Sequence, residues 1–211
     1  MANAAAGLRK VVDSINIAQR QIPTWTVYCL GVLPVPALLW SAQTGGLGRE
    51  PISALEHALG ELALQLLLAG LAITPARKLL GINLLRFRRA IGLLAFLYVS
   101  LHLLVWAVLD VQALDRVWAD IVKRPYITVG MLGFVLLLPL AMTSNDASVR
   151  KLRHLWRKVH MLVYPAVLLG ALHFVMVRKG LQLEPLIYLG AACLLVGLRF
   201  FPRQRPASRN R

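Results

Sequence analysis

The sequence predicts an all-α integral membrane protein, a bundle of six transmembrane helices with both termini in the cytoplasm. Three observations lead to this fold class. Hydrophobic residues make up 58% of the 211 positions, and the mean hydropathy is +0.64, far above a typical soluble domain. Six apolar stretches are close to the roughly 20 residues that a helix needs to cross a bilayer. Lys and Arg residues gather in alternate connections between these stretches, as the positive-inside rule requires.

The six apolar stretches account for most of the chain. We expect membrane helices at residues 24–42, 55–74, 90–109, 126–143, 159–177 and 186–201. Pro34 and Pro36 are expected to kink or shorten the first helix, because proline lacks the backbone N–H that helical hydrogen bonding uses. The expected organisation is a cytoplasmic segment at 1–23, a six-helix transmembrane domain at 24–201 and a basic cytoplasmic tail at 202–211.

The basic residues predict the orientation of the bundle. Eighteen of the 24 Lys and Arg residues lie in the termini and the even-numbered connections, and six lie in the others. The side with more basic residues is cytoplasmic, which indicates a multi-pass protein of the bacterial inner membrane. The net charge of +15 is therefore attributed to topology and membrane lipid. It does not indicate nucleic-acid binding, which would need a basic face on a soluble fold. The polar first 21 residues do not resemble a cleavable signal peptide.

Three histidines lie inside apolar stretches: His102, His160 and His173. Ionisable side chains are rare inside membranes, and those present commonly line a site or a pathway. Neutral imidazole is also a good iron ligand, and helix bundles build cofactor sites from side chains on facing helices. The pattern therefore predicts a membrane haem protein in which these histidines are the iron ligands.

The depths of the histidines favour a ligand pair. At about 1.5 Å per residue, His102 lies about 10 Å and His173 about 6 Å below the outer ends of their helices. One iron can thus take an axial ligand from each. His160 lies about 20 Å deeper than His173 and about 140° away around an ideal helix, so a second haem on it would need a separate site. Arg88 stands where a partner for His160 would lie, and arginine does not ligate iron. The sequence is compatible with one haem or with two.

Other polar residues near the histidines have less specific roles. An intramembrane histidine can simply bond a carbonyl of a neighbouring helix. His57, close to Glu56 and Glu61, fits a proton or quinone site or an interfacial position, and His154 is expected to be solvated. Arg124, at the outer start of the fourth helix, can contact a haem propionate.

Tyr98 and Trp106 flank His102 at i−4 and i+4, so all three share a helix face. Packing between helices is the favoured interpretation for both rings, ahead of contact with a haem.

Several motifs in a fixed order resemble one known family. They are Gly45-Gly46-Leu47-Gly48, Ile73-Thr74-Pro75, Arg86 to Arg89, Leu101-His102-Leu103, Lys123-Arg124-Pro125-Tyr126, Val159-His160, Val163-Tyr164, His173 and Pro185-Leu186-Ile187-Tyr188. From the first membrane segment onward, the chain resembles the MsrQ family, also known as YedZ. These are haem-binding membrane subunits of a periplasmic methionine-sulfoxide reductase system, similar to the transmembrane domain of ferric reductases and NADPH oxidases.

The resemblance implies a b-type cytochrome that conducts electrons. Quinol or a cytoplasmic flavin reductase would deliver them, and a periplasmic molybdopterin subunit would use them to repair oxidised proteins. It implies haem b, FMN without a recognisable motif, and no substrate-reducing site in this chain. His102, His160 and His173 match the family pattern of ferric reductases, in which a fourth histidine is expected where this chain has Arg88.

Three other functions are weighed against this one. A proton-coupled transporter would use His57, Glu61 and the other histidines as a relay, but other polar membrane residues are scarce and no inverted repeat is visible. A membrane anchor would only dock the catalytic subunit. A self-sufficient ferric reductase would need flavin and nicotinamide domains, and a Gly-rich dinucleotide fingerprint between a strand and a helix is missing.

Overall fold

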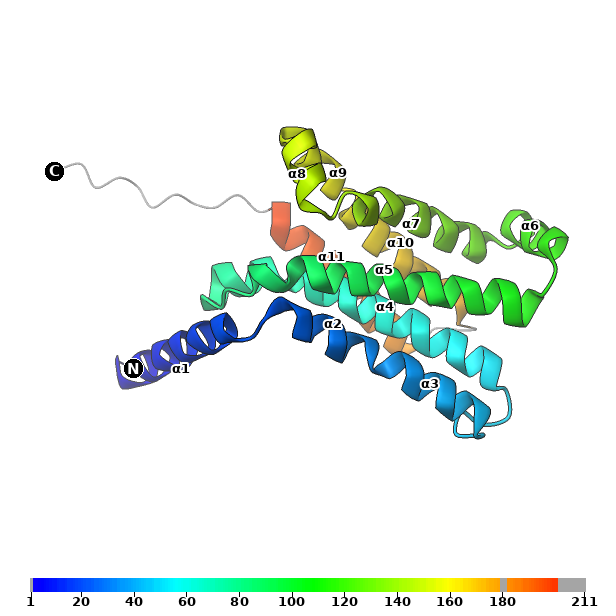
Figure 1. The fold of residues 1–211 in the computed structure, drawn as a ribbon, viewed down its shortest axis with the longest axis horizontal. Helices are drawn as coiled ribbons and strands as arrows, with labels where there is room; N and C mark the ends of the chain where they lie inside the picture. Colours follow the sequence, from blue (N-terminus) through cyan, green and yellow to red (C-terminus); the bar gives the residue numbers. More distant parts are fainter. Residues whose placement is uncertain (1, 179–181, 201–211) are drawn as a thin grey trace.

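The computed structural model describes residues 2–178 and 182–200, and helices form the regular structure throughout that part of the chain (Figure 1). The predicted tail at 202–211 lies outside the described residues. The α-helices are α1 (Ala2–Gln21), α2 (Thr24–Val32), α3 (Pro34–Gln43), α4 (Pro51–Pro75), α5 (Arg88–Leu104), α6 (Leu114–Lys123), α7 (Pro125–Met142), α8 (Asp146–Leu152), α9 (His154–His160), α10 (Val163–Val177) and α11 (Leu183–Phe200). Short π-helical turns η1 (Ala76–Leu80) and η3 (Val105–Val111) and a 3₁₀ turn η2 (Leu85–Phe87) extend α4 and α5.

The predicted all-helical membrane class is confirmed. Among the described residues, five helical stretches are long and apolar enough to cross a membrane: Thr24–Gln43, Pro51–Leu80, Leu85–Val111, Pro125–Met142 and His154–Val177. They correspond to the first five predicted helices, with ends that differ by a few residues. The 18-residue α11 covers most of the sixth predicted stretch and packs against α10 and α4.

Two of the predicted spans are interrupted, each near proline. The first is divided at Leu33, since Pro34 cannot donate the next helical hydrogen bond. The predicted effect of the prolines is therefore observed as a one-residue break. The fifth span is divided between α9 and α10 at Met161 and Leu162, and Pro165 stands in the first turn of α10. This second break separates His160 from the helix that carries His173.

Small residues allow the helices to approach closely at the centre of the bundle. Ala95, Ala171 and Ala192 are completely buried, and Val167 is packed among them. Because lipid is as apolar as the core, close packing of small residues is the main source of helix association in a membrane. The pairs α4–α5 and α7–α10 make the most extensive contacts. This packing brings α4, α5, α7 and α10 around one region of the bundle.

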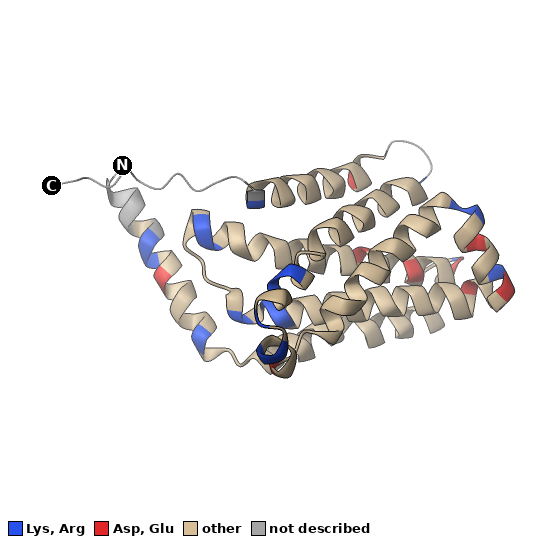
Figure 2. Ribbon diagram, turned by 90° about the horizontal axis from the view of Figure 1, so that it is seen from above, with Lys and Arg blue, Asp and Glu red and all other residues tan. Residues whose placement is uncertain are grey.

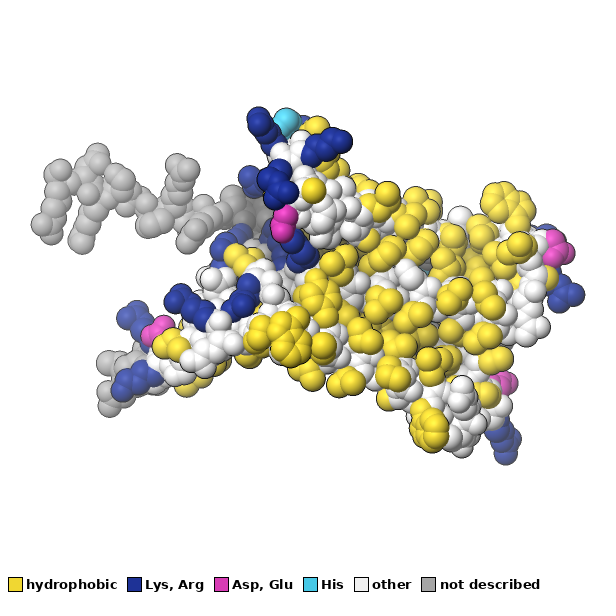
Figure 3. Space-filling model, in the orientation of Figure 1, with side chains coloured by type: hydrophobic (Ala, Val, Ile, Leu, Met, Phe, Trp, Pro, Cys, Tyr) yellow, Lys and Arg dark blue, Asp and Glu magenta, His cyan; other side chains and the backbone are white. Residues whose placement is uncertain are grey.

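The two ends of the bundle differ in charge (Figure 2). Arg86, Arg89 and the run from Arg150 to Lys158 lie at the end that also holds α1, α8 and α9, which we name the basic end. Most Asp and Glu side chains, among them Asp115 and Asp120 of α6, lie at the other end, which we name the acidic end. The long helices run between these ends, and an apolar belt covers the face between them (Figure 3).

Helix α6 carries an exposed apolar stripe at the acidic end. Leu114, Trp118 and Val122 are 87%, 70% and 67% exposed, and their spacing of four residues aligns them on one face. Asp115 and Arg116 occupy other faces of the same helix. An amphipathic helix with a central tryptophan is typical of the membrane–water interface.

We expect α6 to lie in the bilayer interface with its stripe in lipid. A nitroxide label at Trp118→Cys should collide more with oxygen than with a water-soluble relaxation reagent, because oxygen concentrates in lipid. The matched control is the same label at Arg116→Cys, which should show the opposite preference. Both variants need Cys29 and Cys193 replaced by serine. Equal access of the water-soluble reagent to both labels would show that α6 stands in water.

Candidate functional site

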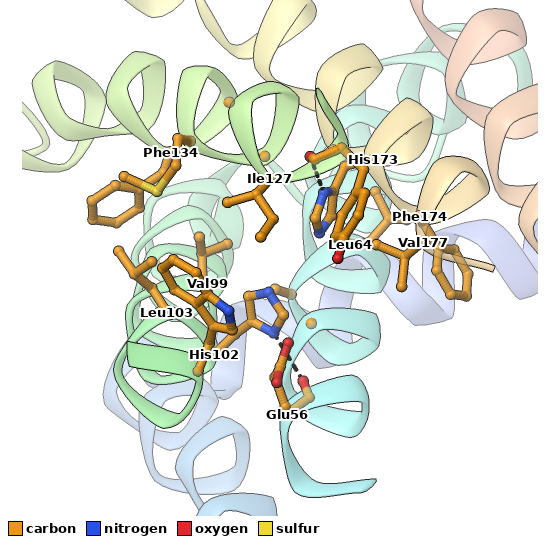
Figure 4. A pocket seen from close by; sticks show the side chains of 18 of the residues that line it. Glu56, Leu64, Val99, His102, Leu103, Ile127, Phe134, His173, Phe174 and Val177 are labelled. Carbon is orange, nitrogen blue, oxygen red and sulfur yellow. Dashed lines mark hydrogen bonds between the residues drawn. The ribbon is translucent and has the colours of Figure 1, made fainter. Parts of the chain in front are cut away.

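The structure brings His102 and His173 together, as their similar depths in the membrane predicted. His102 comes from α5 and His173 from α10, and their ring centroids are 6.2 Å apart with ring planes at 77° (Figure 4). With metal–nitrogen bonds of about 2 Å, two imidazoles on opposite sides of one metal ion have ring centres about 6 Å apart. The observed separation therefore suits two axial ligands of one ion.

Each imidazole is held through its Nδ1 atom. His102 Nδ1 lies 2.9 Å from the carbonyl oxygen of Glu56, and His173 Nδ1 lies 2.7 Å from that of Tyr126. A carbonyl only accepts, so Nδ1 carries the proton and donates it in both bonds. Nε2 of each ring then keeps its lone pair, and in Figure 4 the second nitrogens point towards the space between the rings. This outer hydrogen bond is the usual support of a metal-binding histidine.

Two glycines allow the rings to reach those carbonyls. A Cβ atom on Gly60 would lie 3.0 Å from His102 Nδ1, and one on Gly130 would lie 2.9 Å from His173 Nδ1. Each glycine lies four residues after the residue with the accepting carbonyl. Each imidazole therefore packs against a helical turn that has no side chain at the position facing it. We name these turns the α4 seat (Glu56 and Gly60) and the α7 seat (Tyr126 and Gly130). Neither glycine was predicted from the sequence; the available signal was a glycine inside each apolar stretch.

A cavity of about 270 Å³ opens between the two histidines. Its inner wall is apolar and its mouth towards the acidic end is polar. The apolar wall includes Leu64, Leu67, Val99, Leu103, Met131, Phe134, Leu137, Phe174 and Val177, and the polar groups are Ser53, Glu56, His57, Glu61, Asp110 and Arg124. Trp106 also lines this cavity, whereas Tyr98 turns away and donates to the Gly31 carbonyl oxygen at 2.7 Å. The packing role favoured for Tyr98 is confirmed.

The donor set indicates the kind of metal group that would fit. No group of three or more His, Cys, Asp and Glu residues suited to a metal ion occurs among the described residues. A bare ion would find two imidazoles and few other ligands here. A haem brings four nitrogens of its own and needs only two axial ligands. The facing Nε2 atoms and the apolar wall therefore fit a haem.

Arg124 stands at the mouth of this cavity, where it was predicted to contact a propionate. Its Nε lies 3.1 Å from Asp120 Oδ1, and its NH1 donates to the Tyr126 hydroxyl at 3.1 Å. The hydrogen bond to Tyr126, together with the charge of Asp120, raises the pKa of Arg124 above its usual value. Thr128 Oγ1 donates to the Ile121 carbonyl oxygen at 2.5 Å. These contacts join α6 to the α7 seat.

His160 lies in a different cavity, at the basic end. Its ring stacks on the Trp156 ring, with ring centroids 3.8 Å apart. Its Nδ1 lies 3.1 Å from the Trp156 carbonyl oxygen, and its Nε2 lies 3.5 Å from Ser144 Oγ. The cavity is about 800 Å³ and is rich in basic side chains: Arg88, Arg89, His154, Arg157, Lys158 and Arg199. His160 and His173 thus line separate cavities, as their angular offset predicted. Arg88 lines the cavity where a fourth histidine was expected.

The remaining sequence candidates lie at the two ends. His57 lines the cavity of His102 and His173, 3.5 Å from Ser53 Oγ, and its ring is not one of the facing pair. His154 is exposed at the basic end, as expected. At the same end, Arg89 and Asp146 form an ion pair at 2.7 Å, and this contact lowers the pKa of Asp146.

The chain is similar to known membrane proteins. A family described as "Ferric reductase like transmembrane component" matches residues 57–171. A protein of Agrobacterium fabrum named "Protein-methionine-sulfoxide reductase heme-binding subunit MsrQ" is 46% identical over 83% of this chain and 82% of its own length. Proteins of the same name from Rhizobium meliloti and Brucella anthropi are 49% and 44% identical over 83% and 89% of this chain, and over 82% and 84% of their own lengths. No solved structure matches the chain.

Proposed function

Because this chain belongs to the MsrQ family of ferric-reductase-like membrane proteins, we propose that it is a b-type cytochrome, the haem-binding membrane subunit of a methionine-sulfoxide reductase. His102 and His173 are the proposed axial ligands of the haem iron. The observation that carries the proposal is the facing pair of imidazoles, each with Nδ1 held by a backbone carbonyl.

The residues of this chain have defined tasks in the proposal. When bound, a haem supplies reversible one-electron chemistry. The α4 seat and the α7 seat fix the orientation and tautomer of the two imidazoles, which makes them better ligands. The apolar wall excludes water from the region between the rings, and Arg124 offers a cation to a propionate at the mouth. Substrate reduction is assigned to a partner subunit.

The direction of electron transfer follows from the proposed topology. Six membrane helices with cytoplasmic termini put the basic end on the cytoplasmic side of the bacterial inner membrane. The histidine pair then lies towards the periplasm, where a molybdopterin-containing catalytic subunit would accept the electrons. The donors proposed are membrane quinol or a cytoplasmic flavin reductase. The same proposal includes FMN and a second haem at His160. The basic cavity offers cations to the phosphate of FMN and to the propionates of a haem.

An absorption spectrum of the purified protein, oxidised and then reduced by dithionite, tests the function. We expect sharp b-type bands, which would be missing from a transporter or a simple anchor. A colourless protein that takes up no haem on reconstitution would contradict the proposal.

The number of haems is tested by His160→Ala. We expect this variant to keep the haem held by His102 and His173, because His160 lies in the other cavity. If a second haem binds, the haem-to-protein ratio should fall from about two to about one, and otherwise it should stay at one. The measurement is haem extraction with protein quantified by amino-acid analysis. Complete loss of haem would show that His160 belongs to the first site.

A further inference from the structure

Three side chains form a closed polar cluster between α4 and α11. Gln65 Nε2 donates to Glu61 Oε1 at 2.9 Å and to the Tyr188 hydroxyl at 2.8 Å, and that hydroxyl donates to Glu61 Oε1 at 3.0 Å. Glu61 and Gln65 are one helical turn apart on α4, and Tyr188 is on α11. We name this group the Glu61 cluster.

The cluster lies deep within a membrane span. Glu61 is ten residues from the start of α4, which corresponds to about 15 Å along the helix. Among the nine Asp and Glu residues of the chain, it lies furthest from the end of a span. A carboxylate at such a depth is costly, so it marks a functional site by default. Neither haem ligation nor the contact of Arg124 uses it.

The cluster joins the lipid-facing surface to the cavity of the two histidines. Gln65 is exposed on the surface of α4, and the neighbouring Leu186 and Ile187 of α11 are exposed as well. Glu61 lines the cavity that contains His102 and His173. Tyr188 packs edge-on against Phe174, the residue after His173, with ring centroids 5.5 Å apart. A molecule arriving from lipid would thus meet a polar cluster whose carboxylate lines the cavity of the histidine pair.

The chemistry of the cluster selects one class of molecule. Its carboxylate accepts hydrogen bonds, and its amide and phenol can both donate and accept. The surrounding apolar surface admits a lipid-soluble molecule. We propose that Glu61, Gln65 and Tyr188 bind a lipid-soluble hydroquinone and that Glu61 removes its hydroxyl protons. This inference rests on the proposed function, because the haem held by His102 and His173 is the electron acceptor.

The reaction balances with groups already named. Oxidation of one hydroquinone breaks two O–H bonds and gives a quinone, two protons and two electrons. A haem held by His102 and His173 would take up the two electrons one at a time and pass each of them to the partner subunit. Glu61 accepts each proton in turn and releases it towards the acidic end. His57 and Glu56 line the same cavity in that direction.

The decisive experiment follows haem reduction by decylubiquinol in the haem-loaded full chain, reconstituted in lipid nanodiscs. Glu61→Gln keeps a hydrogen-bonding side chain and loses the base, so we expect the reduction rate to fall by roughly 100-fold or more. Dithionite should still reduce its full haem complement. The matched control is Glu184→Gln, which removes an exposed carboxylate in the first turn of α11 and should leave the rate unchanged.

Binding supplies a second readout that does not depend on turnover. Tyr188→Phe and Gln65→Leu remove partners of the hydroquinone, so an azido-quinone probe should label each variant less than the wild-type chain. In the wild-type chain, the label should map to α4 and α11. These two variants also test the cluster if Glu61→Gln fails to fold.

The outcomes separate the two proposals. A wild-type rate in Glu61→Gln with an intact haem spectrum would overturn the cluster assignment and leave the cytochrome standing. Reduction by a flavin reductase with NADH, and by no hydroquinone, would overturn it in the same way. A wild-type chain that binds no haem would overturn the proposed function itself.

Discussion

Replacing His102 or His173 by alanine is expected to remove the haem between α5 and α10. Each residue supplies one of the two facing Nε2 atoms, so the loss of affinity should exceed the roughly 10–100-fold cost of disturbing the support of a ligand. The measurement is the haem-to-protein ratio by the pyridine haemochrome method, after purification in excess haem.

Two controls make this result specific. His154→Ala removes an exposed imidazole at the basic end and should leave the haem-to-protein ratio unchanged. Added imidazole should enter the space left in His102→Ala or His173→Ala and restore part of the binding, which a misfolded variant would not allow. Full haem content in both alanine variants would show that the axial ligands lie elsewhere.

Adding one methyl group at either seat is the second large expected effect. Gly60→Ala and Gly130→Ala each put a Cβ about 3 Å from a ligand Nδ1, which is too close for the imidazole to keep its position, so the ring must shift and its bond to the carbonyl should weaken. We expect haem affinity to fall by about 10–100-fold, the range seen when such supporting bonds are lost. Titration of the haem-free protein with haem, followed by absorbance, measures it.

The direction of the effect on helix stability strengthens this test. Alanine favours a helix over glycine by about 1 kcal/mol, so a general weakening of α4 or α7 is not expected. Gly190→Ala in α11 is the matched control, because its added methyl group would meet nothing within 4 Å beyond its chain neighbours and the backbone of its own helical turn. Equal haem affinity in all three variants and the wild-type chain would show that the seats do not hold the ligands.

Features that follow from the length of an apolar run, or from a residue's position along its helix, could be predicted from the sequence. The membrane spans follow from continuous apolar runs, and the break at Leu33 follows from Pro34. The proximity of His102 and His173 follows from their similar depth in two parallel-running helices. The separation of His160 follows from its angular offset on the same span, and the observed break at Met161 and Leu162 increases it.

Features that depend on a partner far away in the sequence could not be predicted. Gly60 and Gly130 have no distinctive local pattern, because their importance comes from imidazoles on other helices. Tyr188 lies in the motif Pro185-Leu186-Ile187-Tyr188, but its hydrogen bond to Glu61 spans 127 residues. The amphipathic α6 is only 10 residues long, so a search for membrane-length runs passes over it.

Each ligand and its seat belong to one closely packed pair of helices. The α4–α5 pair holds His102 on the α4 seat, and the α7–α10 pair holds His173 on the α7 seat. Each half is therefore complete with respect to its own imidazole, and a haem would cross-link the two halves. By mass action, a ligand that binds only the docked halves stabilises their docking, by about 2.7 kcal/mol at a concentration 100 times the dissociation constant. Haem supply would then govern how firmly this bundle is assembled in the membrane, as well as whether it conducts electrons.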